Sequence, residues 1–173
     1  MDIMTRRYIS ELAQRVMDVY DIKAPISDIE SIVKKLGGTI EVKREFDDFC
    51  EGTIRKSGEN GFVIAVSPFQ NEQRKAFTIA HELGHLFLHM GFMIDKELWM
   101  NQDQVVYTRF GTSEQEYQAN EFAASLLMPE KLYKEIVDSY SKDNRVNMSE
   151  VASYFNVSIS AAINRGKFLG YLA

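Results

Sequence analysis

Apolar side chains recur every three to four residues near the start of the chain. In segment 5–20 they stand on one face, with polar residues opposite: Ile9, Leu12, Ala13, Val16 and Tyr20. This spacing is typical of an amphipathic helix. A second helix is predicted over 27–36, because acidic residues stand in its first turn, lysines stand in its last turn and Gly37-Gly38 follows.

The spacing then changes from helical to extended. Short runs with β-branched residues stand at 39–42, 52–55 and 62–66. The second and third runs flank Asn60-Gly61, a pair typical of tight turns between antiparallel strands. We therefore predict an α+β fold that is mainly helical, with a small antiparallel sheet of about three strands.

Helical signals return after the third strand run. Ser67, Pro68 and Gln70 suit a capping box, so a helix is predicted from about Pro68 or Asn71 to Met90. No element is assigned to 91–112. Another helix is predicted over 113–127, ending before Pro129, which opens a further helix up to about residue 140.

Residues 148–165 have the spacing of a helix-turn-helix, with two short helices around Asn156-Val157-Ser158. Such a unit can bind DNA. However, its second helix offers only three polar contacts, Asn164, Arg165 and Lys167, and the net charge of the chain is −5. We interpret 1–140 as one domain and 141–173 as a tail packed on it, with a structural or protein-docking role favoured over DNA binding.

The run His81-Glu82-Leu83-Gly84-His85 carries the clearest chemical signal in the chain. Residues four apart share one helix face, so the two imidazoles can converge on one metal ion. Glu82 borders the same point and is placed to accept a proton from a water molecule there. The chain holds three histidines, and two of them stand in this motif.

A catalytic zinc site normally has three protein ligands. His89 lies about 12 Å of helix rise beyond His81, too far for all three imidazoles to reach one ion. Glu116 is the better candidate, because Ala119, Asn120, Ala123 and Leu127 share its helix face and would let a second helix approach closely. Ser113-x-x-Glu116 also fits a capping box, so spacing leaves both interpretations open. Glu114 and Glu121 are the alternatives.

Two blocks together resemble the ImmA/IrrE family of zinc metallopeptidases. The first is the run 74–89 around the two histidines, and the second runs from Glu116 through Ala119-Asn120 and Phe122-Ala123 to Leu126-Leu127-Met128-Pro129. The resemblance implies a zincin-like active-site helix, one Zn²⁺ per chain held by His81, His85 and Glu116, and Glu82 as catalytic acid and base. It further implies an endopeptidase for regulatory proteolysis, with a helix-turn-helix repressor of a mobile element, prophage or stress circuit, encoded nearby, as substrate.

Two features of the reaction stay open at this point. His89, Tyr107 and Tyr117 are candidates for a supporting contact to the ligands or for the hydrogen-bond donor to the oxyanion. The third strand run is predicted to be the sheet edge along which an extended substrate adds as a further strand. The residues of this predicted substrate edge are Phe62, Val63, Ile64, Ala65 and Val66.

Composition places few limits on these interpretations. The 173 residues are 45% hydrophobic and 26% charged, which is typical of a globular protein. One cysteine, Cys50, and no signal peptide or membrane span favour a cytoplasmic location. Two alternatives remain: a DNA-binding regulator that uses the tail, and a non-catalytic, antitoxin-like protein-binding module that has kept zinc.

Overall fold

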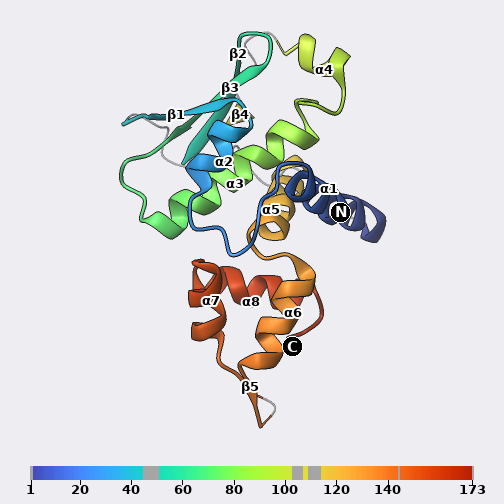
Figure 1. The fold of residues 1–173 in the computed structure, drawn as a ribbon, viewed down its shortest axis with the longest axis vertical. Coiled ribbons are helices and arrows are strands. Elements are labelled where there is room, and N and C mark those ends of the chain that lie inside the picture. Colours follow the sequence, from blue (N-terminus) through green and yellow to red (C-terminus); the bar gives the residue numbers. More distant parts are fainter. Residues whose placement is uncertain (1, 45–50, 103–106, 109–113, 144, 173) are drawn as a thin grey trace.

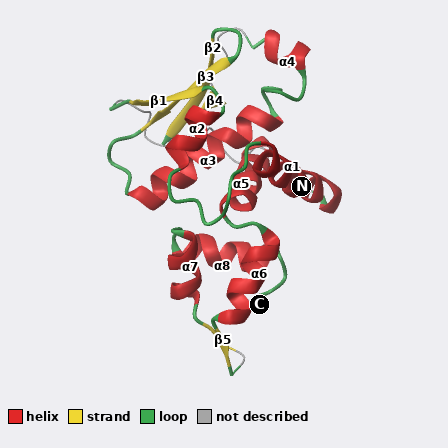
Figure 2. Ribbon diagram, in the orientation of Figure 1, coloured by secondary structure: helices red, strands yellow, loops and turns green. Residues whose placement is uncertain are grey.

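The computed structural model describes residues 2–44, 51–102, 107–108, 114–143 and 145–172 (Figure 1). The helices and strands are shown by type in Figure 2. The helices are α1 Ile3–Val19, α2 Ile29–Lys35, α3 Glu72–Leu88, α4 Lys96–Met100, α5 Glu114–Leu127, α6 Glu130–Ser139, α7 Met148–Phe155 and α8 Ile159–Phe168. The strands are β1 Gly38–Val42, β2 Gly52–Ser57, β3 Gly61–Val66, β4 Tyr107–Thr108, β5 Ser141–Lys142 and β6 Arg145–Val146. The predicted α+β class is confirmed.

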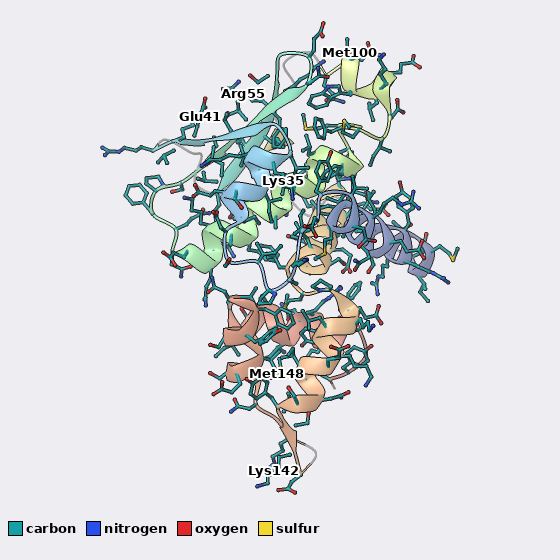
Figure 3. All side chains as sticks on the ribbon, in the orientation of Figure 1. Lys35, Glu41, Arg55, Met100, Lys142 and Met148 are labelled. Atoms are coloured by element: carbon teal, nitrogen blue, oxygen red, sulfur yellow. The ribbon has the colours of Figure 1, made fainter. Side chains whose placement is uncertain are left out.

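The main sheet has the order β1-β3-β2-β4. The predicted hairpin is present, since β2 and β3 pair antiparallel and Ser57 faces Gly61. However, β1 pairs with β3 in parallel, so the sheet is mixed and the expectation of a wholly antiparallel sheet was wrong. Charged groups lie on its exposed side, where Arg55 and Glu41 form an ion pair at 3.0 Å (Figure 3).

The prediction that segment 62–66 forms an edge strand for substrate was also wrong. β3 is paired on both sides, with β1 and β2, so its backbone groups are not available to an added peptide. A continuous apolar run is typical of an interior strand, whereas an edge strand with one wet face alternates. The five residues are accordingly all buried: Phe62, Val63, Ile64, Ala65 and Val66.

The register of β3 shows that its residues pair with a neighbouring strand on each side. Val63 faces Thr39 of β1 and Arg55 of β2. The next two positions are paired in the same way, because Ile64 faces one residue on each neighbouring strand and Ala65 does so too. None of these three residues can therefore serve as the predicted substrate edge.

α3 begins at the later of its two predicted starts. The side chain of Asn71 caps the helix by accepting a hydrogen bond from the backbone N–H of Arg74 at 2.8 Å. Ser67 instead accepts from the N–H of Phe69 within a turn. Gln70 donates from Nε2 to the carbonyl of Glu51 and the hydroxyl of Thr78, so it ties the start of β2 to α3 rather than closing a capping box.

α3 lies at the centre of the fold, in contact with β2, β3, α2 and α5, while α1 covers α5 (Figure 1). The closest approach of α3 and α5 is at Gly84. A Cβ atom added there would lie 2.9 Å from both the Cα and the carbonyl oxygen of Ala119. Because those are backbone atoms, no rotamer change can relieve the contact, and only glycine allows this helix spacing.

α6, α7 and α8 lie together at the C-terminal end of the molecule (Figure 1). The hydroxyl of Tyr133 on α6 donates to the carbonyl of Ala162 on α8. Arg165 on α8 is 2% exposed and pairs with Glu121 on α5 at 2.7 Å. Arg165, a candidate DNA contact in the sequence, is therefore turned inward and joins the tail to α5. The division of the chain at residue 140 stays a prediction.

We predict that Gly84→Ala separates α3 and α5. Overpacking at a backbone contact typically costs about 1–3 kcal/mol, more than the ~1 kcal/mol that alanine gains over glycine in a helix interior. Urea unfolding should show lower stability, and zinc affinity should fall with it. Ala119→Gly should not rescue the variant, because the clashing atoms are backbone; full rescue would contradict this explanation.

Candidate metal centre

α3 places His81, Glu82 and His85 inside the protein, where each is 2% exposed or less. Their helical neighbours are apolar: Ile79, Ala80, Leu83, Leu86 and Phe87 are also buried. Polar side chains in such surroundings are costly unless they have hydrogen-bond partners or a metal. The helix therefore carries a polar site that its apolar context would otherwise exclude.

α5 brings Glu116 to the two histidines, and the three residues are buried together. The Nε2 atoms of His81 and His85 lie 3.1 Å apart. The Glu116 carboxylate oxygens lie 3.3 Å from Nε2 of His81 and 3.2 Å from Nε2 of His85. Each histidine thus has its own Glu116 oxygen, Oε2 for His81 and Oε1 for His85. Zinc–ligand bonds of about 2.0–2.1 Å at tetrahedral angles separate ligand atoms by about 3.4 Å, so these separations suit one zinc ion held by the three residues.

The other carboxylates considered as ligands lie elsewhere. Glu114 is exposed, and Glu121 is occupied by Arg165 and Ser125. Ser113, the partner in the predicted capping box, lies outside the described residues. Among the described residues, Glu116 is thus the carboxylate that the fold brings within reach of both histidines.

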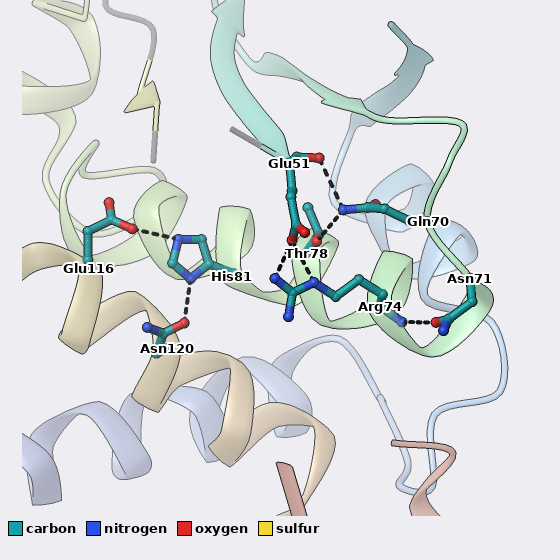
Figure 4. Close-up of polar contacts among 8 residues, drawn as sticks. All are labelled: Glu51, Gln70, Asn71, Arg74, Thr78, His81, Glu116 and Asn120. Carbon is teal, nitrogen blue, oxygen red and sulfur yellow. Dashed lines mark hydrogen bonds and ion pairs between the residues drawn. The ribbon is translucent and has the colours of Figure 1, made fainter. Parts of the chain in front are cut away.

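Each histidine of the site has a hydrogen-bond partner at Nδ1. Nδ1 of His81 lies 2.9 Å from Oδ1 of Asn120, which is one helical turn beyond Glu116 on α5 (Figure 4). Nδ1 of His85 lies 2.9 Å from Nδ1 of His89. If both Nδ1 atoms carry the proton, both Nε2 lone pairs point toward Glu116. The two Nε2 lone pairs and the Glu116 carboxylate would then repel each other. A cation bound between them would remove this repulsion.

Both ring nitrogens of His89 have protein partners, and one of these partners is His85. Nδ1 of His89 contacts His85 and its Nε2 lies 2.9 Å from Oε1 of Gln118. Burial lowers the pKa of His89, although the contact with Gln118 and the charge of Glu116 act in the opposite direction. A neutral ring that donates to Gln118 has the Nδ1 lone pair needed to accept from His85.

No described contact joins Tyr107 or Tyr117 to the three candidate ligands. Tyr117 is 53% exposed and lines a cavity on the tail side of α5. The backbone of Tyr107 forms β4, but its side chain lies outside the described residues. The hydrogen-bond donor to the oxyanion is thus still a prediction.

Glu82 lies beside the start of β2. A Cβ atom added at Gly52 would lie 3.1 Å from Oε1 of Glu82 and 2.5 Å from Cγ2 of Thr78, so only glycine lets the strand approach this closely. Glu51 holds the strand end in place, since its carbonyl accepts from Gln70 and its carboxylate pairs with Arg74 (Figure 4).

Sequence reasoning did not find these supporting contacts. Gln118, Gly52 and Glu51 carry no local signal, because each acquires its role only when β2 and α5 pack against α3. Asn120 does have a local signal, because it stands four residues after Glu116 on the same helix face. From the sequence, this residue was considered only as a small side chain that lets the two helices approach.

The model of the IrrE N-terminal-like domain, a peptidase family, matches residues 38–167. The chain belongs to this family. This confirms the resemblance to ImmA/IrrE proteins and the assignment to a metallopeptidase family with a buried group of metal-ligating residues. Among the described residues, no helix is long and apolar enough to cross a membrane.

A similar sequence and a similar structure extend this comparison. The chain is 34% identical over 91 residues to "Metallopeptidase ImmA" of Bacillus subtilis (strain 168), covering 51% of this chain and 46% of that protein. A solved structure named "Mycobacterium tuberculosis transcriptional regulator" superposes with a TM-score of 0.58 at 14% identity, over 92% of this chain and 46% of that one. The second likeness shows the fold alone. The chain spans about half the length of each relative.

We predict that Asn120→Leu weakens zinc binding by about 10–100-fold, because removing the acceptor that orients a ligating histidine typically has this effect. Competition with a chromophoric chelator would measure the affinity. Asn120→Asp keeps an acceptor oxygen at the same place and should bind zinc at least as well as the wild type. Equal zinc affinity in Asn120→Leu and the wild type would show that Asn120 does not orient His81.

Proposed function

We propose that the protein is a zinc-dependent endopeptidase that uses His81, His85 and Glu116 as ligands and Glu82 as acid and base. The observation that carries this proposal is that the Nε2 atoms of His81 and His85 lie 3.1 Å apart and each has a Glu116 carboxylate oxygen beside it, at 3.3 and 3.2 Å. Membership in a peptidase family supports a protein substrate. One Zn²⁺ per chain is expected, since the described residues form one such group.

A zinc ion held at this site would act as a Lewis acid toward water and the substrate carbonyl. The chain supplies the proton transfers. Glu82 follows His81 on α3, so its carboxylate can accept a proton from the attacking water and deliver it to the leaving amine. The absence of a side chain at Gly52 leaves room for this carboxylate beside the start of β2.

The geometry of the sheet changes the proposed substrate path. β3 cannot receive a peptide, and the described edge strands are β1 and β4. β2 begins beside Glu82, and β4 pairs with its first half, with Thr53 facing Thr108 and Ile54 facing Tyr107. We propose that substrate runs past the β2–β4 side of the sheet, which is the side that adjoins the catalytic glutamate.

We further propose regulatory proteolysis of a helix-turn-helix repressor encoded nearby, in a mobile element, prophage or stress circuit. The resemblance to the ImmA/IrrE family supports this substrate class. Such a repressor acts on intracellular DNA, so the proposal includes a cytoplasmic location. The alternative of a DNA-binding regulator is weakened by Arg165, because its guanidinium is buried against Glu121. A non-catalytic protein-binding module that retains zinc is the other alternative.

We predict that Glu82→Gln keeps about one zinc per chain but lowers peptide cleavage by at least about 100-fold, because only the proton acceptor is lost. Glu116→Ala should lose most of its zinc. Plasma mass spectrometry on tag-free protein gives the metal content. A fully active Glu82→Gln variant would favour the non-catalytic module, and a wild type that binds no zinc would overturn the metal centre.

The substrate proposal has its own test. Purified zinc-loaded protein is incubated with the repressor encoded by the neighbouring gene, and fragments are identified by mass spectrometry. We expect cleavage at one or a few bonds, because folded substrates expose few extended segments. Glu82→Gln is the matched control for contaminating proteases. Degradation of unrelated unfolded proteins at the same rate would contradict a narrow specificity.

A further inference from the structure

A cavity of about 860 Å³ lies between the helices α3 and α5, which carry the proposed metal ligands, and the tail. Its walls come from α1, α3, α5 and α8, together with the turn before α8. A volume of this size suits a small organic molecule, and junctions between packed units are common places for such sites.

The cavity is separate from the metal centre. Its described lining includes none of the proposed ligands, nor Glu82. The ring of His81 faces Glu116 with Nε2 and Asn120 with Nδ1, and Asn120 itself lines the cavity (Figure 4). The cavity therefore lies on the side of His81 away from Glu116, with Asn120 between the cavity and the imidazole.

The charges around the cavity favour an anion. Of the residues that the structure describes, three arginines and one glutamate line it: Arg6, Arg74, Arg165 and Glu121. Arg74 and Arg165 have carboxylate partners. Arg6 makes no ion pair within the described part of the chain. It lies 4.5 Å over the ring of Phe168, at the cavity wall.

A buried donor supplies an independent sign of a missing acceptor. Arg165 is 2% exposed, and its Nη2 has no hydrogen-bond partner among the described residues. Its Nε and Nη1 are satisfied by the carbonyl of Met128 and by Glu121. A buried guanidinium nitrogen without an acceptor is costly. Because Arg165 also lines the cavity, a small shift of its side chain would bring this donor to an anionic group there.

The remaining lining provides flat apolar surfaces and neutral polar groups. Phe77, Tyr117 and Phe168 contribute aromatic rings, and Ser160 and Asn164 contribute a hydroxyl and an amide. Rings beside an arginine suit a planar aromatic ligand, which can stack while its anionic group meets the guanidinium.

We propose that this cavity is a binding site for a small aromatic anion, carrying a carboxylate or a phosphate. Because Asn120 contacts both the cavity and His81, occupancy of the cavity changes zinc affinity. The binding site does not depend on peptidase activity, whereas its coupling to zinc rests on the proposed metal centre.

The binding is tested with 2-naphthoate and 1-naphthyl phosphate, titrated into the full chain and followed by nitrogen-15 NMR. At least one of them should bind with a Kd of about 1 mM or tighter, and the tighter one identifies the anionic group. Neutral 2-naphthamide, the matched uncharged probe, should bind about tenfold more weakly. No binding by either anion, or equal binding by the amide, would overturn the site.

Two variants locate the binding. Arg6→Gln should weaken binding of the anion about fivefold or more, because it removes the positive charge at the cavity wall. Arg7→Gln is the matched control, since Arg7 is the next residue on α1, is exposed and pairs with Glu11 outside the cavity. Equal losses in the two variants would place the anion elsewhere on α1.

The coupling is tested by measuring zinc affinity with and without a saturating anion. By linkage, the anion's Kd must differ between apo and zinc-loaded protein by the same factor, which we expect to be about threefold or more. Identical zinc affinities would overturn the coupling but leave the binding site. If the wild type takes up no zinc, the proposed metal centre and the coupling are both overturned. The anion-binding site is judged separately, because the NMR titration does not require zinc.

Discussion

The distance between α3 and α5 decides whether His81, His85 and Glu116 lie close enough together to hold one metal ion. The histidines come from one helix and Glu116 from the other, so the three ligand atoms meet only if the backbones approach closely. Gly84 stands between the histidines and faces Ala119, where any side chain would contact backbone atoms. Buried Phe122 and Ala123 continue the contact along α5. The spacing is thus set by the smallest residues of the interface and maintained by the apolar core around it.

α5 connects the metal centre to the rest of the molecule. Within two turns it presents Glu116 to the histidines, Asn120 to the far side of His81 and Glu121 to Arg165 of the tail. A displacement of this helix would change the ligand distances, the orientation of a ligand and the packing of the tail together. Burial raises the pKa of Glu121, while Arg165 and Ser125 favour its charged form. The contact between α5 and the tail therefore depends on Arg165 staying paired with Glu121.

The parts of this structure that were predictable are those with a local cause. The helices and the hairpin follow from periodicity and turn residues, and the two histidines follow from their four-residue spacing. The order of the sheet was not predictable, because the parallel pairing of β1 with β3 joins strands that are not neighbours in the sequence, and no local pattern specifies it. The capping box at Ser67 failed for a similar reason: Gln70 finds better partners on Glu51 and Thr78 than at the helix end.

Arg165 shows how far a motif can differ from its usual function. In a helix-turn-helix that reads DNA, the basic residues of the second helix project outward to phosphates and base edges. Here the guanidinium is withdrawn into the interior and neutralised by Glu121, so the second helix loses its strongest anion-binding group on the outer surface. With a net charge of −5, the chain offers little long-range attraction to compensate. The same two-helix spacing instead serves to pack α8 against α5 and to close one wall of the cavity.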